Sequence, residues 1–186
     1  MTIEKGANWG EIVQTRVDGL VATGDLAREL GLAGAATSHP GPWLRLPLDL
    51  IDVVAVDSAG RRHERTIASW LVAGSLLRGE YCIVSSTSFV DGRRLFSRAH
   101  PNDGRLDWLA VQPSMSLRQR LAFRRRTRSE THLPHPLVGV GTGPGLSRSF
   151  VRPVTVRFES SEPIKAVVEL TSTIRPDAMV THIPAS

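Results

Sequence analysis

The stretch Ser-Arg-Ala-His-Pro-Asn-Asp-Gly-Arg-Leu-Asp-Trp, residues 97–108, combines a turn with the beginning of a strand. Asn102-Asp103-Gly104 has the composition of a tight turn, because Asn and Asp bond their own backbone and Gly adopts a positive φ freely. Leu106, Trp108 and Ala110 then recur at every second position, as in a strand with one buried face. The stretch therefore predicts a turn that leads directly into a sheet.

Two roles remain open for the carboxylate of Asp103. A carboxylate beside a glycine turn can converge with backbone carbonyls to hold a hard cation such as Mg²⁺. The alternative is a turn that only joins two strands, which is common for this composition. Residue chemistry alone favours the simple turn.

The chain on both sides of this stretch is mostly β in pattern. Apolar or β-branched runs between turn residues predict strands at 53–57, 65–72, 81–89, 106–111, 136–140, 154–158, 164–170 and 179–183. Many short strands separated by turns favour a β-sandwich or a related sheet stack. We therefore predict a mainly β (α+β) fold with one or two short helices.

Helix signals occur in two places. Residues 21–32 are typical of a loop that enters a helix, with Thr23 or Asp25 as the cap and Gly31 at its end. Ser116 and Gln119 have the spacing of a capping box, which predicts a second helix over 117–128.

In this second helix Leu117 and Leu121 supply the predicted apolar stripe. Six arginines and no acidic residue lie on it: Arg118, Arg120, Arg124, Arg125, Arg126 and Arg128. Such a block is either a solvated face or a site for polyanions such as phospholipid headgroups or nucleotide phosphates. Nucleic acid is the weakest of these alternatives, because Phe123 is the only aromatic residue available for stacking.

Composition narrows the class of protein further. The 186 residues suit one domain, or one domain plus a fragment of another. The net charge is +5, and one cysteine, Cys82, excludes an internal disulfide. No apolar run approaches the roughly 18–20 residues that span a bilayer. We expect a cytoplasmic protein, peripheral at the membrane if it binds lipid. The glycine-rich run 139–145 is predicted to be a hairpin connection. The histidines are not predicted to bind a metal, because no cysteine pair or acidic cluster completes a set of four ligands.

Three segments resemble one family, and they occur in the order of that family. Residues 100–107, His-Pro-Asn-Asp-Gly-Arg-Leu-Asp, resemble the Pro-x-Asp-Asp-Gly-x-Leu-Asp signature of the diacylglycerol kinase and bacterial lipid kinase family. Residues 23–31, Thr-Gly-Asp-Leu-Ala-Arg-Glu-Leu-Gly, are similar to its Gly-Thr-Gly-Asn-Asp-Leu-Ala-Arg segment. Residues 118–136 resemble a helix and a His-x-Pro-His-Pro stretch of actinobacterial members. Together the three cover roughly residues 20–170.

The resemblance implies an architecture. Family members have an N-terminal α/β nucleotide-binding domain and a C-terminal β-sandwich, with the active site between them. By this resemblance residues 1–42 are a remnant of the first domain, and residues 43–186 form the sandwich. The remnant carries the motif residues Thr23, Gly24 and Asp25.

The resemblance also implies a Mg²⁺ site. In the family one carboxylate and two backbone carbonyls hold the ion, which by position would be Asp103 with the carbonyls of His100 and Arg105. Because carbonyl ligands survive a change of side chain, the departures at positions 100 and 105 are compatible with the site.

Two parts of the family's machinery do not occur in this sequence. It has no Gly-Gly-Asp-Gly-Thr loop, whose amides would cradle the phosphates of ATP. The Asp-Gly-Glu near the last strands is replaced by Glu169, Leu170 and Thr171. Thr171 cannot act as the base for a lipid hydroxyl, and Glu169 would need a one-residue slip that reverses its facing. We therefore expect no ATP binding by this chain alone and no catalytic residue beyond the weak candidate Glu169.

These observations lead to one expectation and two alternatives. The chain is expected to be a divergent, non-catalytic relative that binds lipid or anionic headgroups through Arg118, Arg124, Arg125, Arg126 and Arg128. One alternative is half of a split lipid kinase whose nucleotide-binding subunit is a separate polypeptide. The other is a regulatory interaction module or homo-oligomer; nucleic acid is not an expected partner.

Overall fold

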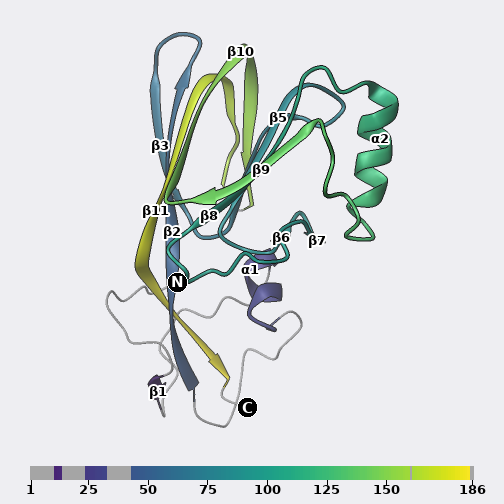
Figure 1. Cartoon of the computed structure of the whole chain (residues 1–186). Coiled ribbons are helices and arrows are strands. Elements are labelled where there is room, and N and C mark those ends of the chain that lie inside the picture. Colours follow the sequence, from purple (N-terminus) through teal and green to yellow (C-terminus); the bar gives the residue numbers. More distant parts are fainter. Residues whose placement is uncertain (1–10, 14–23, 33–42, 160, 185–186) are drawn as a thin grey trace.

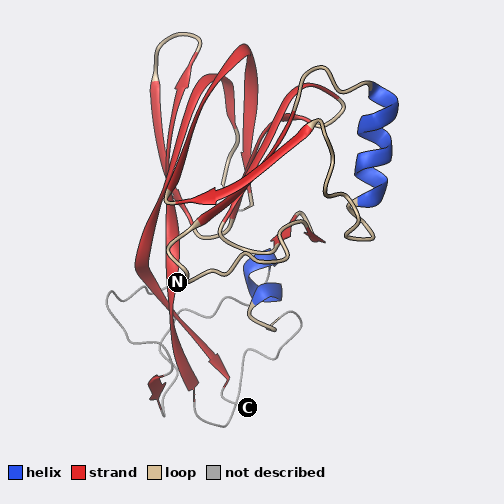
Figure 2. Ribbon diagram, in the orientation of Figure 1, coloured by secondary structure: helices blue, strands red, loops and turns tan. Residues whose placement is uncertain are grey.

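A computed structural model describes residues 11–13, 24–32, 43–159 and 161–184 (Figure 1). Figure 2 shows that strands dominate, with two short helices among these residues. The elements are β1 (Glu11–Val13), α1 (Gly24–Glu29), β2 (Trp43–Asp57), β3 (Arg62–Ile67), β4 (Trp70–Ser75), β5 (Arg78–Ser85), β6 (Phe89–Val90), β7 (Arg93–Arg94), β8 (Leu106–Val111), α2 (Leu117–Arg126), β9 (Val138–Gly143), β10 (Gly145–Phe158) and β11 (Ile164–Pro184). The predicted mainly β fold is confirmed.

Nine of these strands form one antiparallel sheet. Its order is β1-β2-β11-β10-β4-β5-β8-β9, with β3 also paired to β2, while β6 and β7 form a separate hairpin. The sheet folds over on itself, so that β8 and β9 come in front of β10 and β11 in Figure 1. The longest ladder joins β2 to β11 and runs from Trp43↔Pro184 to Val167↔Asp57.

The main core lies between the two halves of this folded sheet. Buried residues of β2, β10 and β11, such as Ile51, Val156 and Leu170, meet residues of β4 and β5, such as Leu71 and Val84. A fully buried aliphatic side chain contributes about 1.5–3 kcal/mol. The cluster therefore holds the two halves of the sheet together.

A second core covers the outer face of β4, β5 and β8. Val72, Ile83 and Leu109 point away from the first core and pack with Phe123 of α2 and Met115 of the preceding loop. Since successive side chains of a strand face opposite sides, these strands are buried on both faces. This accounts for the continuous apolar runs 70–73, 81–84 and 108–111 within them.

The ends of β2 and β11 extend past the sandwich to α1. Leu48 and Leu50 of β2 and Met179 of β11 pack against Leu26 of this helix. A break in the register between Arg175 and Met179 bends the ladder at this level.

Two predicted strands are interrupted. The run 65–72 divides into β3 and β4, and the run 81–89 divides into β5 and β6. The breaks coincide with buried hydroxyl residues that replace the ladder with local hydrogen bonds: the Ser85 hydroxyl donates to the Thr87 carbonyl at 2.8 Å, and the Ser86 amide donates to the Ser69 carbonyl at 3.0 Å.

The glycine-rich run 139–145 is mostly strand, which corrects the predicted hairpin connection. Gly139, Gly141 and Gly143 belong to β9, and the turn is confined to Pro144. A Cβ at Gly141 would lie 2.4 Å from the ring of Trp108 on β8. The glycine is therefore needed because an aromatic ring covers the strand, a contact that local sequence does not reveal.

Helix α2 begins as predicted, but its inward and outward faces are exchanged. The Ser116 side chain and the Gln119 side chain form the expected capping box. However, Leu117 and Leu121 are exposed, whereas Phe123 and Arg120 are buried, the latter only 1% exposed. The predicted apolar stripe is therefore wrong, and one arginine belongs to the interior.

The guanidinium of Arg120 is buried because it donates hydrogen bonds to backbone carbonyls of two separate segments. It donates to the carbonyl of Leu76 (3.1 Å) in the β4–β5 turn and to that of Gly79 (2.6 Å) at the start of β5. It also donates to those of Gln112 (2.9 Å) and Met115 (2.8 Å) between β8 and α2. A planar group with five donors can satisfy several loop carbonyls that no strand reaches.

None of the helices among the described residues is long and apolar enough to cross a bilayer.

Replacement of Arg120 by Met tests this interior role. It leaves the loop carbonyls without donors, so the free energy of unfolding in urea should fall by about 3 kcal/mol or more. The exposed neighbour provides the control, because Arg118→Met should change stability by less than about 0.5 kcal/mol. Equal effects of the two substitutions would contradict the assignment.

Candidate functional site

The Asn-Asp-Gly turn is fixed from beneath by a buried aspartate of β2. The carboxylate of Asp49 accepts from the Gly104 amide (2.7 Å) and from the Asp177 amide (3.0 Å). The Asp49 amide in turn donates to the Pro101 carbonyl (2.8 Å). One residue therefore joins β2, the turn and the bend of β11.

This arrangement follows from the left-handed backbone conformation of the two residues that donate to Asp49. Gly104 has φ 69° and Asp177 has φ 50°, values that lie in the left-handed region. Their amides do not point along a strand ladder and need an acceptor. Our sequence analysis did not identify Asp49, although an acidic residue between Leu48 and Leu50 in an apolar strand is a visible signal of such a role.

Several carboxylates influence one another around this turn. Burial raises the pKa of Asp49, and the negative charges of Asp177 and Asp103 raise it further, against the two amide bonds that lower it. Burial also raises the pKa of Asp107, with Asp103 again adding to the effect. Asp103 itself is exposed and accepts from the Arg105 amide at 3.0 Å. The charge of Asp103 thus acts on both neighbouring carboxyls, while Arg105 opposes it at Asp107.

The fit of these residues to Mg²⁺ is limited to a weak site. No group of three or more His, Cys, Asp or Glu side chains in the described part of the chain could hold a metal. Mg²⁺ usually keeps several waters and takes only one or two carboxylates, so in this turn Asp103 is the side chain that would hold it.

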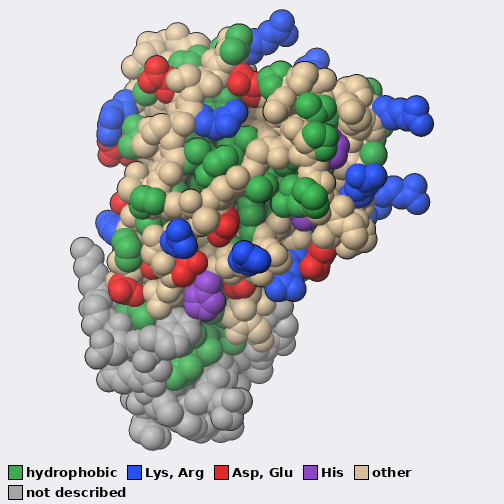
Figure 3. Space-filling view, in the orientation of Figure 1, with side chains coloured by type: hydrophobic (Ala, Val, Ile, Leu, Met, Phe, Trp, Pro, Cys, Tyr) green, Lys and Arg blue, Asp and Glu red, His purple; other side chains and the backbone are tan. Residues whose placement is uncertain are grey.

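The arginine face of α2, which we define as Arg118, Arg124, Arg125, Arg126 and Arg128, is exposed throughout. None of these five side chains forms an ion pair with another described residue. Figure 3 shows blue side chains projecting from the right-hand edge, where Figure 1 places α2. The structure therefore leaves this positive charge available to a partner.

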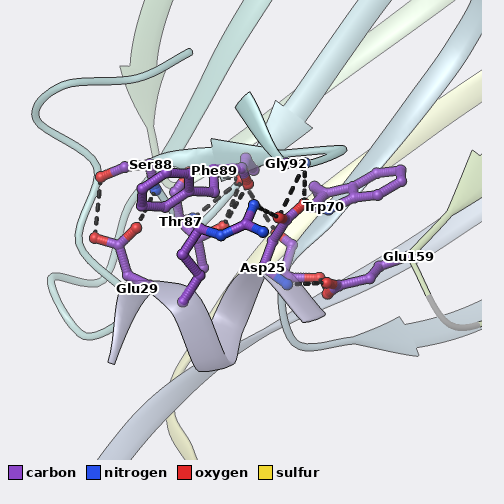
Figure 4. Close-up of polar contacts among 11 residues, drawn as sticks. Asp25, Glu29, Trp70, Thr87, Ser88, Phe89, Gly92 and Glu159 are labelled. Atoms are coloured by element: carbon purple, nitrogen blue, oxygen red, sulfur yellow. Dashed lines mark hydrogen bonds and ion pairs between the residues drawn. The ribbon is translucent and has the colours of Figure 1, made fainter. Parts of the chain in front are cut away.

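The predicted nucleotide-domain remnant packs as a small helix against the sandwich (Figure 4). The carboxylate of Asp25 accepts from the Trp70 indole (2.8 Å) and the Gly92 amide (3.0 Å), and it pairs with Arg28 at 3.2 Å. The Asp25 amide donates to the carboxylate of Glu159. Asp25 therefore lies in the first turn of α1 and is engaged by the sandwich; it is not the cap.

The remaining contacts of this helix have the same character. Glu29 accepts from both the amide (2.9 Å) and the hydroxyl (3.0 Å) of Ser88. Gly24 has φ 89°, and a Cβ there would lie 2.6 Å from an oxygen of Glu159. Thr23, the other predicted cap, lies outside the described residues. The polar groups of α1 thus fix its position, and the Asp25 carboxylate is not free for a nucleotide.

The weak catalytic candidate Glu169 is exposed on β11, where it is paired with Ser149 and Val56. Thr171, two residues on, shares a hydrogen bond with the Ser147 hydroxyl at 3.2 Å. No described side chain bonds to the Glu169 carboxylate. Its candidacy as a base therefore rests on its position in the sequence alone.

A cavity lies between the outer face of β4–β5 and α2. It is lined mainly by apolar side chains, including Val72, Ile83 and Phe123, with Arg93 and Arg157 among the polar residues. Its volume of about 50 Å³ is far below the 300–1,000 Å³ that typical ligand pockets have. We assign it no ligand.

Cys82 of β5 is buried in the first core. Burial raises the pKa of its thiol to about 11, so it is unreactive.

Substitution of Asp49 by Asn tests how the turn is held. An Asn side chain has one oxygen that accepts, whereas the backbone N–H groups of Gly104 and Asp177 each need an acceptor. The NH₂ group of the Asn would therefore face one of these two donors. We expect the free energy of unfolding to fall by about 1–3 kcal/mol and hydrogen exchange at Gly104 to accelerate. Asp52→Asn on the same strand is the control, since Asp52 is 43% exposed and pairs with Arg175 at the surface. Unchanged exchange at Gly104 would contradict this role of Asp49.

Comparison with known proteins gives a result only at the level of structure. No protein-family model matches the sequence, and no curated protein matches it either. Among solved structures, a diacylglycerol kinase from Bacillus anthracis str. Sterne is similar with a TM-score of 0.51 and 11% identity. The match covers 84% of this chain and 61% of that protein.

Two further structures, both described as putative diacylglycerol kinases from the same organism, are less similar. One has a TM-score of 0.43 at 10% identity, over 72% of this chain and 40% of that one. The other has a TM-score of 0.41 at 12% identity, over 70% of this chain and 38% of that one. The chain thus spans about three fifths of the first of these proteins and shares the fold of that part of a diacylglycerol kinase-like lipid kinase.

Proposed function

We propose that this chain binds anionic phospholipid surfaces through the arginine face of α2. The observation that supports this most directly is the concentration of five exposed, unpaired arginines on one helix and the turn after it, judged among the described residues. Each basic residue near an anionic membrane contributes about 1 kcal/mol of attraction. Together the five are sufficient for reversible peripheral binding.

A structural role does not account for these arginines. Arg120 alone turns inward and satisfies the loop carbonyls. The arginine face makes no comparable contact, apart from main-chain bonds that any residue would make. Unpaired like charges along one helix cost stability through mutual repulsion, so their presence is better explained by an external anion.

The structure favours a lipid surface over nucleic acid. Single-stranded nucleic acids are bound by aromatic side chains that stack on bases, combined with basic grooves. Phe123, the aromatic residue of α2, is buried and packs edge-on against His132. The large apolar side chains exposed on this helix are instead Leu117 and Leu121, which suit the boundary of a bilayer.

Neutralising three of the arginines tests this proposal. In flotation with phosphatidylglycerol vesicles at low salt, Arg118→Gln, Arg124→Gln and Arg125→Gln combined should weaken binding about 100-fold, since three charges account for about 3 kcal/mol. Binding of the native chain should also decline as salt is raised.

The control removes the same charge from other exposed positions, with Arg65→Gln, Arg98→Gln and Lys165→Gln, and should bind almost as the native chain does. Equal losses in the two triple variants would show attraction by net charge alone. Preferential binding of DNA over vesicles would replace the lipid proposal with a nucleic-acid one.

A second candidate is one component of a lipid kinase, with Mg²⁺ at the Asn-Asp-Gly turn. The fold likeness to part of a diacylglycerol kinase supports it, as does the exposed carboxylate of Asp103. By the family resemblance Asp103 would hold the ion with the carbonyls of His100 and Arg105, and the ion would neutralise phosphate charge. In this second proposal the nucleotide-binding subunit is a separate polypeptide.

Calorimetric titration distinguishes these roles. Mg²⁺ should bind the native chain weakly, in the millimolar range, because one carboxylate is a sparse ligand set. Asp103→Asn should abolish that binding, whereas Asp91→Asn on another exposed turn should not. ATP with Mg²⁺ should give no heat of binding with this chain alone; a clear ATP signal would contradict the non-catalytic proposal.

A further inference from the structure

Large apolar side chains are exposed at few places in the described structure, and several of them occur together. These side chains are Leu77 (45%), Leu117 (56%), Leu121 (49%), Val140 (50%) and Val151 (92%). Leu117 and Leu121 lie on α2, and Leu77 lies in the β4–β5 turn that α2 contacts. Exposed apolar residues grouped in this way indicate an interaction surface.

The two leucines of α2 lie among its arginines. At about 100° per residue, the succession around the helix is Arg124, Leu117, Leu121, Arg125 and Arg118, within an arc of about 120°. The residues that face the core, Arg120, Phe123 and Thr127, lie outside this arc. The arc is therefore a narrow apolar strip with guanidinium groups on both sides.

The main chain around Leu77 is tied to α2 by the buried arginine. Arg120 donates to the carbonyls of Leu76 and Gly79, which lie on the two sides of Leu77 in the turn. Arg78, directly after Leu77, is exposed and has no ion-pair partner among the described residues. The turn and the helix thus present leucine and arginine together on one rigid support.

We propose that Leu77, Leu117 and Leu121 insert into the headgroup–acyl boundary of an anionic bilayer, with α2 lying along the surface. This inference rests on the proposed function and gives it an orientation. The three leucines, which we call the leucine strip, enter below the phosphates, while the flanking guanidiniums stay at phosphate level because long arginine side chains reach back to the polar layer.

Charge complementarity identifies the occupant as a lipid surface. A protein groove for this strip would need carboxylates opposite each arginine at fixed positions, whereas an anionic bilayer supplies phosphates at any position. A helix of ten residues is also about 15 Å long, which suits contact along an interface and not the crossing of a bilayer.

A fluorescent probe tests the insertion. Cys82 is the only cysteine, and it is buried with a thiol pKa of about 11, so Leu121→Cys can be labelled selectively with an environment-sensitive fluorophore. On phosphatidylglycerol vesicles its emission should shift to the blue and be quenched by lipids brominated near the headgroup. The same label at Val140→Cys, on the separate strand β9, should do neither.

A binding measurement complements the probe. Leu77→Asn, Leu117→Asn and Leu121→Asn combined should weaken vesicle binding about tenfold or more, whereas Val140→Asn should have no effect. If native protein floats with vesicles but the probe at 121 is unchanged, the insertion is overturned and the proposed lipid binding stands. If native protein fails to float at low salt, both are overturned.

Discussion

The arrangement of the molecule depends on a bend in the β2–β11 ladder. The carboxylate of Asp49 stabilises this bend by accepting hydrogen bonds that the ladder does not satisfy. The two longest strands lose their register between Arg175 and Met179, and a break inside a sheet leaves amides without acceptors. Asp49 supplies both oxygens, one to this bend and one to Gly104 of the Asn-Asp-Gly turn. The turn therefore has its position because the ladder must bend there, whether or not a cation binds beside it.

Local signals in the sequence were sufficient for elements whose causes are local. Alternation over 106–111 and the Ser116–Gln119 capping box gave the bounds of β8 and the start of α2 correctly. The single buried face predicted for β8 was wrong, because Leu109 and Val111 pack in the second core. The inward face of α2 could not be predicted in this way. Arg120 is buried for the sake of carbonyls some 40 residues earlier, so a hydrophobic pattern assigns it to the solvent.

The candidate site shows the same limit. Asp103 and the five arginines were visible as motifs, and all of them are exposed. Asp49 and Glu159, whose contacts place the turn and α1, were missed because each bonds to residues distant in the sequence. Asp25 lies in the Thr-Gly-Asp segment, which resembles a nucleotide-domain motif, but its carboxylate accepts hydrogen bonds from Trp70 and Gly92. A residue of such a motif can thus have a packing function.

The requirements of folding do not explain which residues occupy the outward-facing positions of α2. The interior needs Arg120 and Phe123 from this helix, and both would be equally well placed if the outward positions carried glutamate and lysine in alternation. Mixed charges would form stabilising pairs one turn apart, whereas an all-arginine face forgoes them. Exposed leucines among those arginines add a cost in solubility. Because stability accounts for neither choice, the composition of this surface supports the proposed partner, a phospholipid bilayer, which has anionic and apolar layers next to each other.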